Sequence, residues 1–206
     1  MVMTEVIKQL REKTGAGIME CKRALAQANS DIDMAISYLR EKGAVKACEK
    51  SNRPASEGIV HSYIHGDGRI GVLVEVNAET DFAVKSEKFR LFVKEIGLQI
   101  AACSPRYVCR EDIPLDIIED TKGQFISQVM NKGKTGELLD KIIEGKMEKF
   151  YQEVCLMDQA YVKEPAKTVK DIMTEAVMAI NENIIINKFT RYEIGKGSLT
   201  NEFSIQ

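Results

Sequence analysis

Apolar residues recur at helical spacing in three short segments at the start of the chain. These segments are residues 4–13, 18–28 and 32–42. Asp31 is expected to cap the third helix, and Gly43 is expected to end it. Three helices in about forty residues predict a compact module that is marginal alone but suits a docking domain. The polar, basic and proline-containing stretch at 44–56 predicts a linker or an exposed helix that frays.

Alternating branched residues predict strands further along the chain. Residues 57–64 and 70–77 flank a glycine-rich turn and predict an antiparallel hairpin. A third β-rich run, 184–194, completes a three-stranded antiparallel sheet. Helical periodicity predicts four more helices: one that follows the corner at residues 77–82 and runs to about residue 103, and three at residues 117–131, 135–155 and 169–181. We expect residues 156–165 to form a loop with exposed apolar side chains, and residues 195–206 to be a disordered tail.

These elements predict an α+β fold with two domains. Residues 1–55 hold the three-helix module and its linker. Residues 56–206 hold a core in which the three-stranded antiparallel sheet packs on helices. A small sheet leaves uncovered edges, which invite pairing with a second copy of the chain, so we expect a homodimer.

Composition narrows the class of protein. Of the 206 residues, 44% are hydrophobic and 29% are charged, as in a soluble globular protein. The net charge of −2 argues against coating a nucleic acid. The first 55 residues carry a net charge of +3, which fits docking on an acidic protein surface or ordinary variation between segments. The sequence has no run of 18 apolar residues that would predict a membrane span, and no targeting leader is visible. We therefore expect a cytoplasmic protein.

Neither a metal site nor a nucleotide site is predicted, and we expect no cofactor. The five cysteines include no CxxC pair, which indicates reduced thiols. The two histidines, His61 and His65, have no cysteine pattern beside them that would complete a metal site. The glycines at 66, 68 and 71 match neither phosphate-binding spacing, and their segment ends in a strand.

The corner between the second strand and the following helix concentrates unusual chemistry. Residues 77–82 place two carboxylates, a hydroxyl and an aromatic ring on a few positions. In one interpretation Thr80 or Asp81 caps the helix, and Phe82 fixes the corner to the core. In the other, Asp81 and Phe82 protrude as a charged tip with an apolar ring.

Three stretches together resemble the elongation factor Ts family. They are residues 10–17 (LREKTGAG) with Cys21-Lys22 and Ala24-Leu25, residues 71–82 (GVLVEVNAETDF), and the residues Gly145-Lys146, Lys149-Phe150, Glu153, Asp158-Gln159 and Lys167-Thr168-Val169. Their order and spacing are similar to the short form of the family, which has one core repeat. The family usually reads TDFVA at the corner, whereas this chain has Ala83 before Val84.

The resemblance implies a guanine-nucleotide exchange factor for the GTPase elongation factor Tu, with no covalent catalysis. The three-helix module would resemble a ubiquitin-associated (UBA-like) domain and dock on the GTPase domain. The Thr-Asp-Phe tip would insert near the magnesium site of the GTPase. The implied partner-binding residues are Arg11, Ile18, Met19, Lys22, Lys50, Thr80, Asp81, Phe82 and Val84. His65 is either a further contact or an ordinary residue beside a turn.

Two other functional classes stand beside this one. A dimeric UBA-like adaptor would bind a protein through the three-helix module without any effect on a nucleotide. A hydrolase or metal enzyme would use Glu79 and Asp81. The enzyme hypothesis is weak because no histidine, lysine or glycine-rich motif accompanies these two carboxylates.

Overall fold

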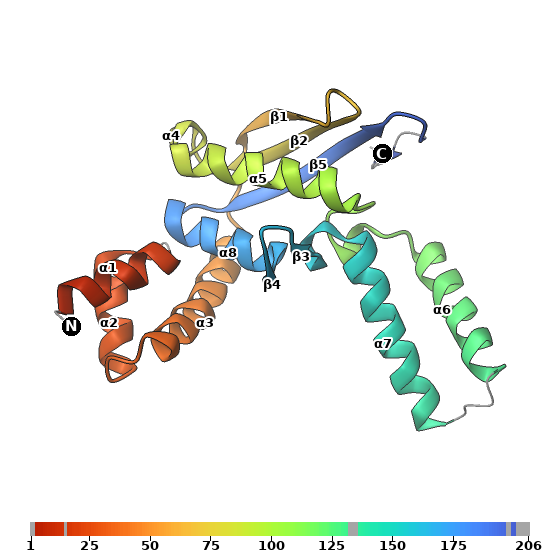
Figure 1. The fold of residues 1–206 in the computed structure, drawn as a ribbon, viewed down its shortest axis with the longest axis horizontal. Helices are drawn as coiled ribbons and strands as arrows, with labels where there is room; N and C mark the ends of the chain where they lie inside the picture. The colour runs from red at the N-terminus through yellow and green to blue at the C-terminus, as the bar shows by residue number, and fades with distance from the viewer. Residues whose placement is uncertain (1–2, 15, 132–135, 197–198, 201–206) are drawn as a thin grey trace. The chain divides into compact units, whose positions relative to one another are not determined.

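The structure is a computed structural model that describes residues 3–14, 16–131, 136–196 and 199–200 (Figure 1). The chain divides into two compact units, which are described separately. Unit 1 comprises residues 1–62, 74–97 and 170–187, and unit 2 comprises residues 63–73, 98–169 and 188–206.

Unit 1 begins with the three predicted helices, here called the N-terminal module. They are α1 (Met3–Thr14), α2 (Ile18–Gln27) and α3 (Ile32–Lys50). Their apolar faces meet in a core of small and branched residues: Leu10, Ala16, Cys21, Ala24, Leu25, Ala28, Ala35 and Leu39. Asp31 caps α3 as predicted, since its carboxylate accepts a hydrogen bond from the Met34 amide at 2.8 Å.

The predicted end of α3 at Gly43 is wrong, because the helix continues to Lys50. Of the two alternatives for residues 44–56, the helix therefore holds as far as Lys50. Gly43 is buried, and a Cβ placed there would lie 2.0 Å from the Met178 sulfur. The glycine serves a close approach between α3 and α8 (Val169–Ile180), which is a contact that sequence spacing does not reveal.

The main sheet contains the three predicted strands β1 (Glu57–His65), β2 (Ile70–Ala78) and β5 (Ile184–Glu193) in the order β1-β2-β5 (Figure 1). The predicted three-stranded antiparallel sheet is confirmed. A short fourth strand, β6 (Leu199–Thr200), pairs antiparallel with β5. The prediction of disorder is therefore wrong at 199–200, while residues 201–206 lie outside the described residues.

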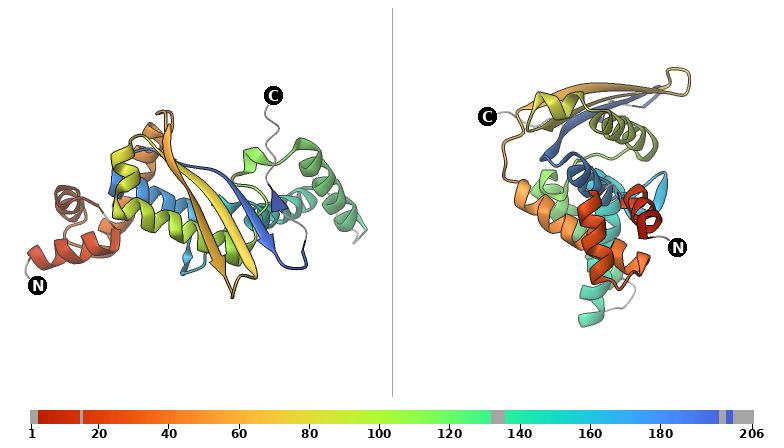
Figure 2. Two further views of the ribbon diagram at one scale, coloured as in Figure 1. Left: turned by 90° about the horizontal axis from the view of Figure 1, so that it is seen from above. Right: turned by 90° about the vertical axis from the view of Figure 1, so that its left-hand side faces the viewer.

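In unit 1, α4 (Asp81–Lys85) and the first part of α5 (Glu87–Cys103) follow β2, and α5 lies along one face of the strands (Figure 2). Alternate β2 residues are buried because successive side chains of a strand point to opposite faces. The α5 residues Phe89, Val93 and Ile96 are fully buried. These apolar faces place the β2–α4 corner on a packed core.

Unit 2 contains two of the predicted helices, α6 (Leu115–Met130) and α7 (Glu137–Val154), which pack against each other. Val129, Ile143 and Met147 form its buried centre. The Arg110 guanidinium, in the 3-10 helix Arg110–Asp112, joins Glu148 of α7 and Asp158 through hydrogen bonds of 2.7 and 2.5 Å.

The segment after α7 was expected to be a loop with exposed apolar side chains, and this expectation is wrong except at Val162, which is 42% exposed. A 3-10 helix, Leu156–Asp158, leads into a small antiparallel hairpin of β3 (Ala160–Tyr161) and β4 (Glu164–Thr168). The Leu156 and Tyr161 side chains are buried. Tyr161 pairs with Glu164 of β4, and the Leu156 amide donates to the Tyr107 carbonyl at 2.9 Å, contacts that the sequence pattern does not reveal.

All five cysteines are free in the structure, and their environments differ. Cys48 and Cys103 are exposed, whereas Cys21 and Cys155 are buried. Burial raises the pKa of the Cys109 thiol and of the Cys155 thiol to about 12. Both thiols therefore stay protonated near neutral pH, which makes them poor nucleophiles.

Candidate partner-binding site

The β2–α4 corner is built by a threonine cap. Thr80 has extended backbone angles, φ −130° and ψ 154°, and its hydroxyl accepts a hydrogen bond from the Ala83 amide at 3.2 Å. Threonine is a favoured residue at this position because its oxygen satisfies an amide that has no partner within the helix. Of the two capping residues considered from the sequence, Thr80 is therefore the cap and Asp81 is the first residue of α4.

Phe82 protrudes from the corner instead of fixing it to the core. Its side chain is 83% exposed, although burying a phenylalanine ring contributes roughly 1.5–3 kcal/mol. The next residue, Ala83, is buried. The structure thus favours the protruding interpretation of Thr80, Asp81 and Phe82, which are called the tip from here on.

Asp81 supplies the charge of the tip. Its carboxylate accepts a hydrogen bond from the Lys85 ammonium at 2.7 Å, one helical turn further on. This hydrogen bond lowers the pKa of the Asp81 carboxyl, so the group is ionised at neutral pH. Both side chains are largely exposed, and such pairs contribute little to folding. The carboxylate can therefore exchange Lys85 for a partner at small cost.

Val84 was predicted to contact a partner, but its side chain is only 7% exposed and belongs to the core. Its amide donates to the Thr80 carbonyl at 3.3 Å, which closes the first turn of α4. The exchanged order of Ala83 and Val84 is compatible with burial of both residues. Val84 therefore supports the tip from beneath and offers little surface to a partner.

Lys50 is also buried, at 9% exposure, and the prediction of a surface contact needs the same correction. Its ammonium donates to the backbone carbonyl of Asn181 and, at 2.7 Å, to the side-chain oxygen of Asn181. Burial lowers the pKa of Lys50, and the positive charge of Arg53 adds to this effect. Lys50 thus joins the end of α3 to the turn between α8 and β5.

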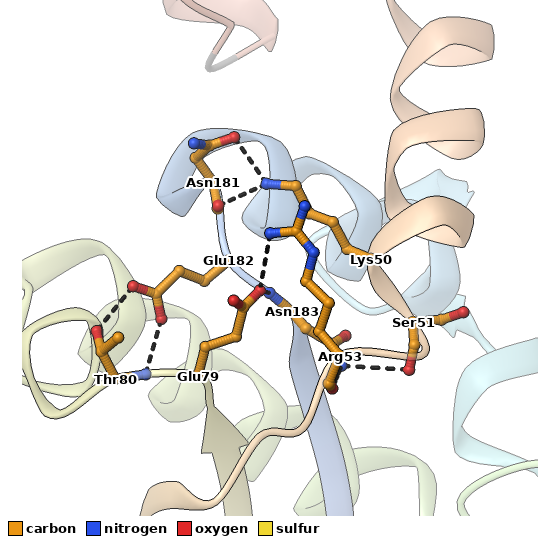
Figure 3. A network of polar contacts seen from close by, with 8 residues as sticks. All are labelled: Lys50, Ser51, Arg53, Glu79, Thr80, Asn181, Glu182 and Asn183. Carbon is orange, nitrogen blue, oxygen red and sulfur yellow. Dashed lines mark hydrogen bonds and ion pairs between the residues drawn. The ribbon is translucent and has the colours of Figure 1, made fainter.

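A network of polar contacts joins Thr80 of the tip and the neighbouring Glu79 to the turn between α8 and β5 (Figure 3). The Glu182 carboxylate accepts from the Thr80 amide at 3.0 Å and from the Thr80 hydroxyl at 2.7 Å. The Glu79 carboxylate accepts from the Asn183 amide at 2.6 Å and lies 3.6 Å from the Arg53 guanidinium. Sequence reasoning missed the roles of these residues. The only local signal was the polar run Asn181-Glu182-Asn183 between an apolar helix and an apolar strand.

The N-terminal module presents the other predicted contact residues. Ile18 and Met19 are exposed on the first turn of α2, and Arg11 and Lys22 are exposed as well. Gly17 caps α2, and its amide donates to the Glu20 carboxylate at 3.3 Å. Two neighbouring apolar side chains beside cationic groups form a surface that suits a protein partner. Gly15 of the TGAG sequence lies outside the described residues.

His65 belongs to unit 2, whereas the tip and the N-terminal module belong to unit 1. The His65 ring is exposed and stacks on Tyr63, with ring centroids 6.0 Å apart. The Tyr63 hydroxyl and His65 Nδ1 lie 3.1 Å apart and share a hydrogen bond. This pairing holds the His65 ring beside Tyr63, and a contact between His65 and a partner stays a prediction.

The described residues contain no group of three or more histidine, cysteine or acidic side chains that could hold a metal ion. Among the helices that the structure describes, none combines the length and the apolar character needed to cross a bilayer. What the corner offers is an exposed aromatic ring and a carboxylate on a rigidly capped turn. Such groups act by binding, and aromatic residues of this kind are common anchors in protein interfaces.

The sequence resembles known proteins over nearly its whole length. The family described as Elongation factor TS matches residues 2–196. Elongation factor Ts of Caldanaerobacter subterraneus subsp. tengcongensis is 52% identical over 197 residues, which are 96% of this chain and 98% of the relative. Elongation factor Ts of Acetivibrio thermocellus is 51% identical over 96% of this chain and 92% of its own. Elongation factor Ts of Moorella thermoacetica is 47% identical over 202 residues, 98% of this chain and 100% of its own.

Proposed function

Because the chain belongs to the elongation factor TS family, and is thus a translation elongation factor, we propose that it is the guanine-nucleotide exchange factor for the GTPase elongation factor Tu. The observation that carries this proposal is the exposure of Phe82 on a capped corner. A ring held in water at this cost is useful to a protein that inserts it into a partner.

In the proposed mechanism the tip inserts beside the magnesium site of the GTPase. Mg²⁺ demands near-ideal octahedral geometry, so a small displacement of its surroundings weakens metal and phosphate binding together. Binding of the exchange factor and binding of GDP then oppose each other, and this negative coupling is reciprocal. The exchange factor forms and breaks no covalent bond. Because translation takes place in the cytoplasm, we place the protein there, without direct contact to nucleic acid or membrane.

The proposed function is tested by displacement of a fluorescent GDP from elongation factor Tu. We expect the release rate to rise with the concentration of this protein and to saturate as the complex fills. A dimeric adaptor that only docks would leave the release rate unchanged. If the two proteins co-elute but the rate of GDP release is unchanged, the exchange function is refuted and the adaptor function takes its place.

We propose that Ile18 and Met19 form the docking patch of the N-terminal module, with Arg11 and Lys22 as its cationic rim. Replacing both apolar residues by alanine should weaken binding to elongation factor Tu by about tenfold or more, since central apolar contacts carry most interface energy. The core of the module does not include either side chain, so its helical circular dichroism should persist. Binding is measured by titration, with Met34→Ala as the control because Met34 is equally exposed elsewhere in the module. Loss of the helical signal, or unchanged affinity, would contradict the docking role.

We also propose a homodimer that pairs through the sheet of residues 56–206. In the order of strands, β1 is an edge strand. Within unit 2, the apolar side chains Ile64, Leu73 and Tyr192 are exposed, whereas Val72 and Phe189 on the same strands are buried. Because side chains alternate along a strand, the exposed residues lie on the uncovered face of the sheet. Exposed apolar patches of this kind mark interaction sites.

Leu73→Glu should convert the proposed dimer to a monomer at micromolar concentration, because a carboxylate buried against a second apolar face lacks a partner. Light scattering on the full chain measures the mass. Leu115→Glu is the matched control, since Leu115 is exposed on α6 in the same unit. A wild-type protein that is already monomeric, or a Leu73 variant that stays dimeric, would contradict this interface.

A further inference from the structure

Two corners of unit 1 are joined by hydrogen bonds in which a glutamate of each corner accepts from a backbone amide of the other (Figure 3). One corner joins β2 to α4, and the other joins α8 to β5. Glu182 of the second corner accepts from the amide of Thr80 in the first, and Glu79 of the first accepts from the amide of Asn183 in the second. The two glutamates and these two amides are called the reciprocal clamp.

We propose that Glu182 is a positioning residue that sets the direction in which the tip presents Phe82, through the reciprocal clamp. The expected effect of Glu182 on the rate of GDP release rests on the proposed exchange function. The immobilisation of the tip is independent of that function. Glu182 itself reaches no partner in this proposal and acts only through Thr80.

The chemistry of Thr80 explains why a carboxylate suits this place. The Thr80 hydroxyl oxygen already accepts from the Ala83 amide as the cap of α4. The hydroxyl proton of Thr80 must therefore point elsewhere. The hydroxyl donates a hydrogen bond to Glu182 Oε1 at 2.7 Å, and the Thr80 amide donates one to Glu182 Oε2 at 3.0 Å. An ionised carboxylate offers two acceptor oxygens, whereas a neutral amide side chain offers only one. Glu182 thus fixes both the backbone and the side-chain rotamer of Thr80, two residues before Phe82.

The opposite corner is firm enough to act as a support. Asn181 has a positive φ of 65°, a conformation that asparagine tolerates better than most residues. The buried Lys50 ammonium binds both oxygens of Asn181. The Asn183 side-chain amide donates to the carbonyl oxygens of Ser51 and Arg53, at 3.3 and 2.8 Å. The residues on both sides of Glu182 are therefore anchored to the end of α3.

The tip itself has little other support on its exposed side. α4 is only five residues long, and helices of this length are not stable by themselves. Ala83 and Val84 hold α4 to the core from beneath. Within the described residues, the hydrogen bonds that reach the tip from another element all come from Glu182. Removing this one carboxylate should therefore loosen the tip and leave the core intact.

The test replaces Glu182 by glutamine, which has the same shape and one acceptor fewer. In the full-length protein, hydrogen exchange of the Thr80 and Ala83 amides should become about tenfold faster, as expected when a hydrogen bond to a charged acceptor is lost. The Val74 and Val76 amides of the same unit should keep their exchange rates.

The activity readout separates positioning from docking. The rate of fluorescent-GDP release from elongation factor Tu at saturating exchange factor should fall about tenfold in Glu182→Gln, as for lost pre-organisation. The half-saturating concentration should change less than about twofold, because the docking patch is untouched. Glu119→Gln, an exposed residue of α6 with the same change in charge, should leave both quantities unchanged.

A second variant protects the test against a simple loss of folding. Thr80→Val removes the hydroxyl, and the double variant with Glu182→Gln should be little worse than Thr80→Val alone, because the two residues act as a unit. Unchanged exchange of the Thr80 and Ala83 amides in Glu182→Gln would overturn the clamp, whatever the rate of GDP release. If Glu182→Gln showed faster hydrogen exchange of these amides but the same rate of GDP release as an active wild type, the clamp would have no role in nucleotide exchange. No stimulation by the wild type would instead refute the proposed function.

Discussion

Phe82→Ala is expected to slow stimulated GDP release about thirtyfold and to leave folding almost unchanged. Truncation of an aromatic anchor at the centre of an interface commonly costs about 2 kcal/mol or more. This loss is roughly thirtyfold at about 1.4 kcal/mol per decade. The ring is 83% exposed in the free protein, so its removal takes few contacts from the core. The measurement is the rate of fluorescent-GDP release from elongation factor Tu, together with thermal unfolding of the variant alone.

Asp81→Ala tests the charged half of the tip in the same assay. Thr80, and not Asp81, caps α4, and the pairing of Asp81 with Lys85 is exposed. We therefore expect a change in the unfolding free energy within about 0.5 kcal/mol, as at ordinary surface positions. GDP release should nevertheless slow. Wild-type exchange in both Phe82→Ala and Asp81→Ala at matched concentration would show that the tip is not the active element.

Phe89→Ala should have the opposite profile, with the largest loss of stability among these changes. Phe89 lies seven positions after Phe82 in the sequence, but its side chain is 0% exposed. Truncation of a buried phenylalanine typically costs about 3–5 kcal/mol, from lost transfer energy and from the cavity left behind. Urea unfolding monitored by circular dichroism measures this loss.

The two phenylalanines are controls for each other. They are chemically identical, and they differ in whether folding removes the ring from water. A Phe82→Ala variant as unstable as Phe89→Ala would mean that the corner is an ordinary part of the core. A Phe89→Ala variant with wild-type stability would contradict the packing of α5 against the strands.

Periodicity in the sequence was sufficient to predict the helices and strands whose buried face follows from the spacing of their own residues. The alternation of Val72, Val74 and Val76 predicted β2, and the capping signal at Asp31 predicted the start of α3. Both follow from the geometry of a single element. The end of α3 was missed because Gly43 resembles a helix stop, while its actual role is to admit Met178 from a helix about 130 residues later.

In the candidate site, too, the sequence indicates what depends on neighbouring residues and misses what depends on distant ones. A short motif drew attention to the tip, since its residues are adjacent in the sequence, but it left a structural corner and a protruding tip as alternatives. The buried positions of Val84 and Lys50, and the role of Glu182, depend on contacts across the fold. Thr80 and Glu182 are 102 residues apart, and Lys50 and Asn181 are 131 apart. A single sequence contains no local pattern that joins such positions.

The long separation within the reciprocal clamp has a consequence for how the protein is made. A ribosome adds roughly 5–20 residues per second, so Glu182 leaves it several seconds or more after Thr80. Contacts between such distant residues also form late, because a long loop must close first. During synthesis the growing chain exposes Phe82 before its support exists. We therefore expect a newly made chain to gain a fixed tip only when α8 and the start of β5 have joined the fold.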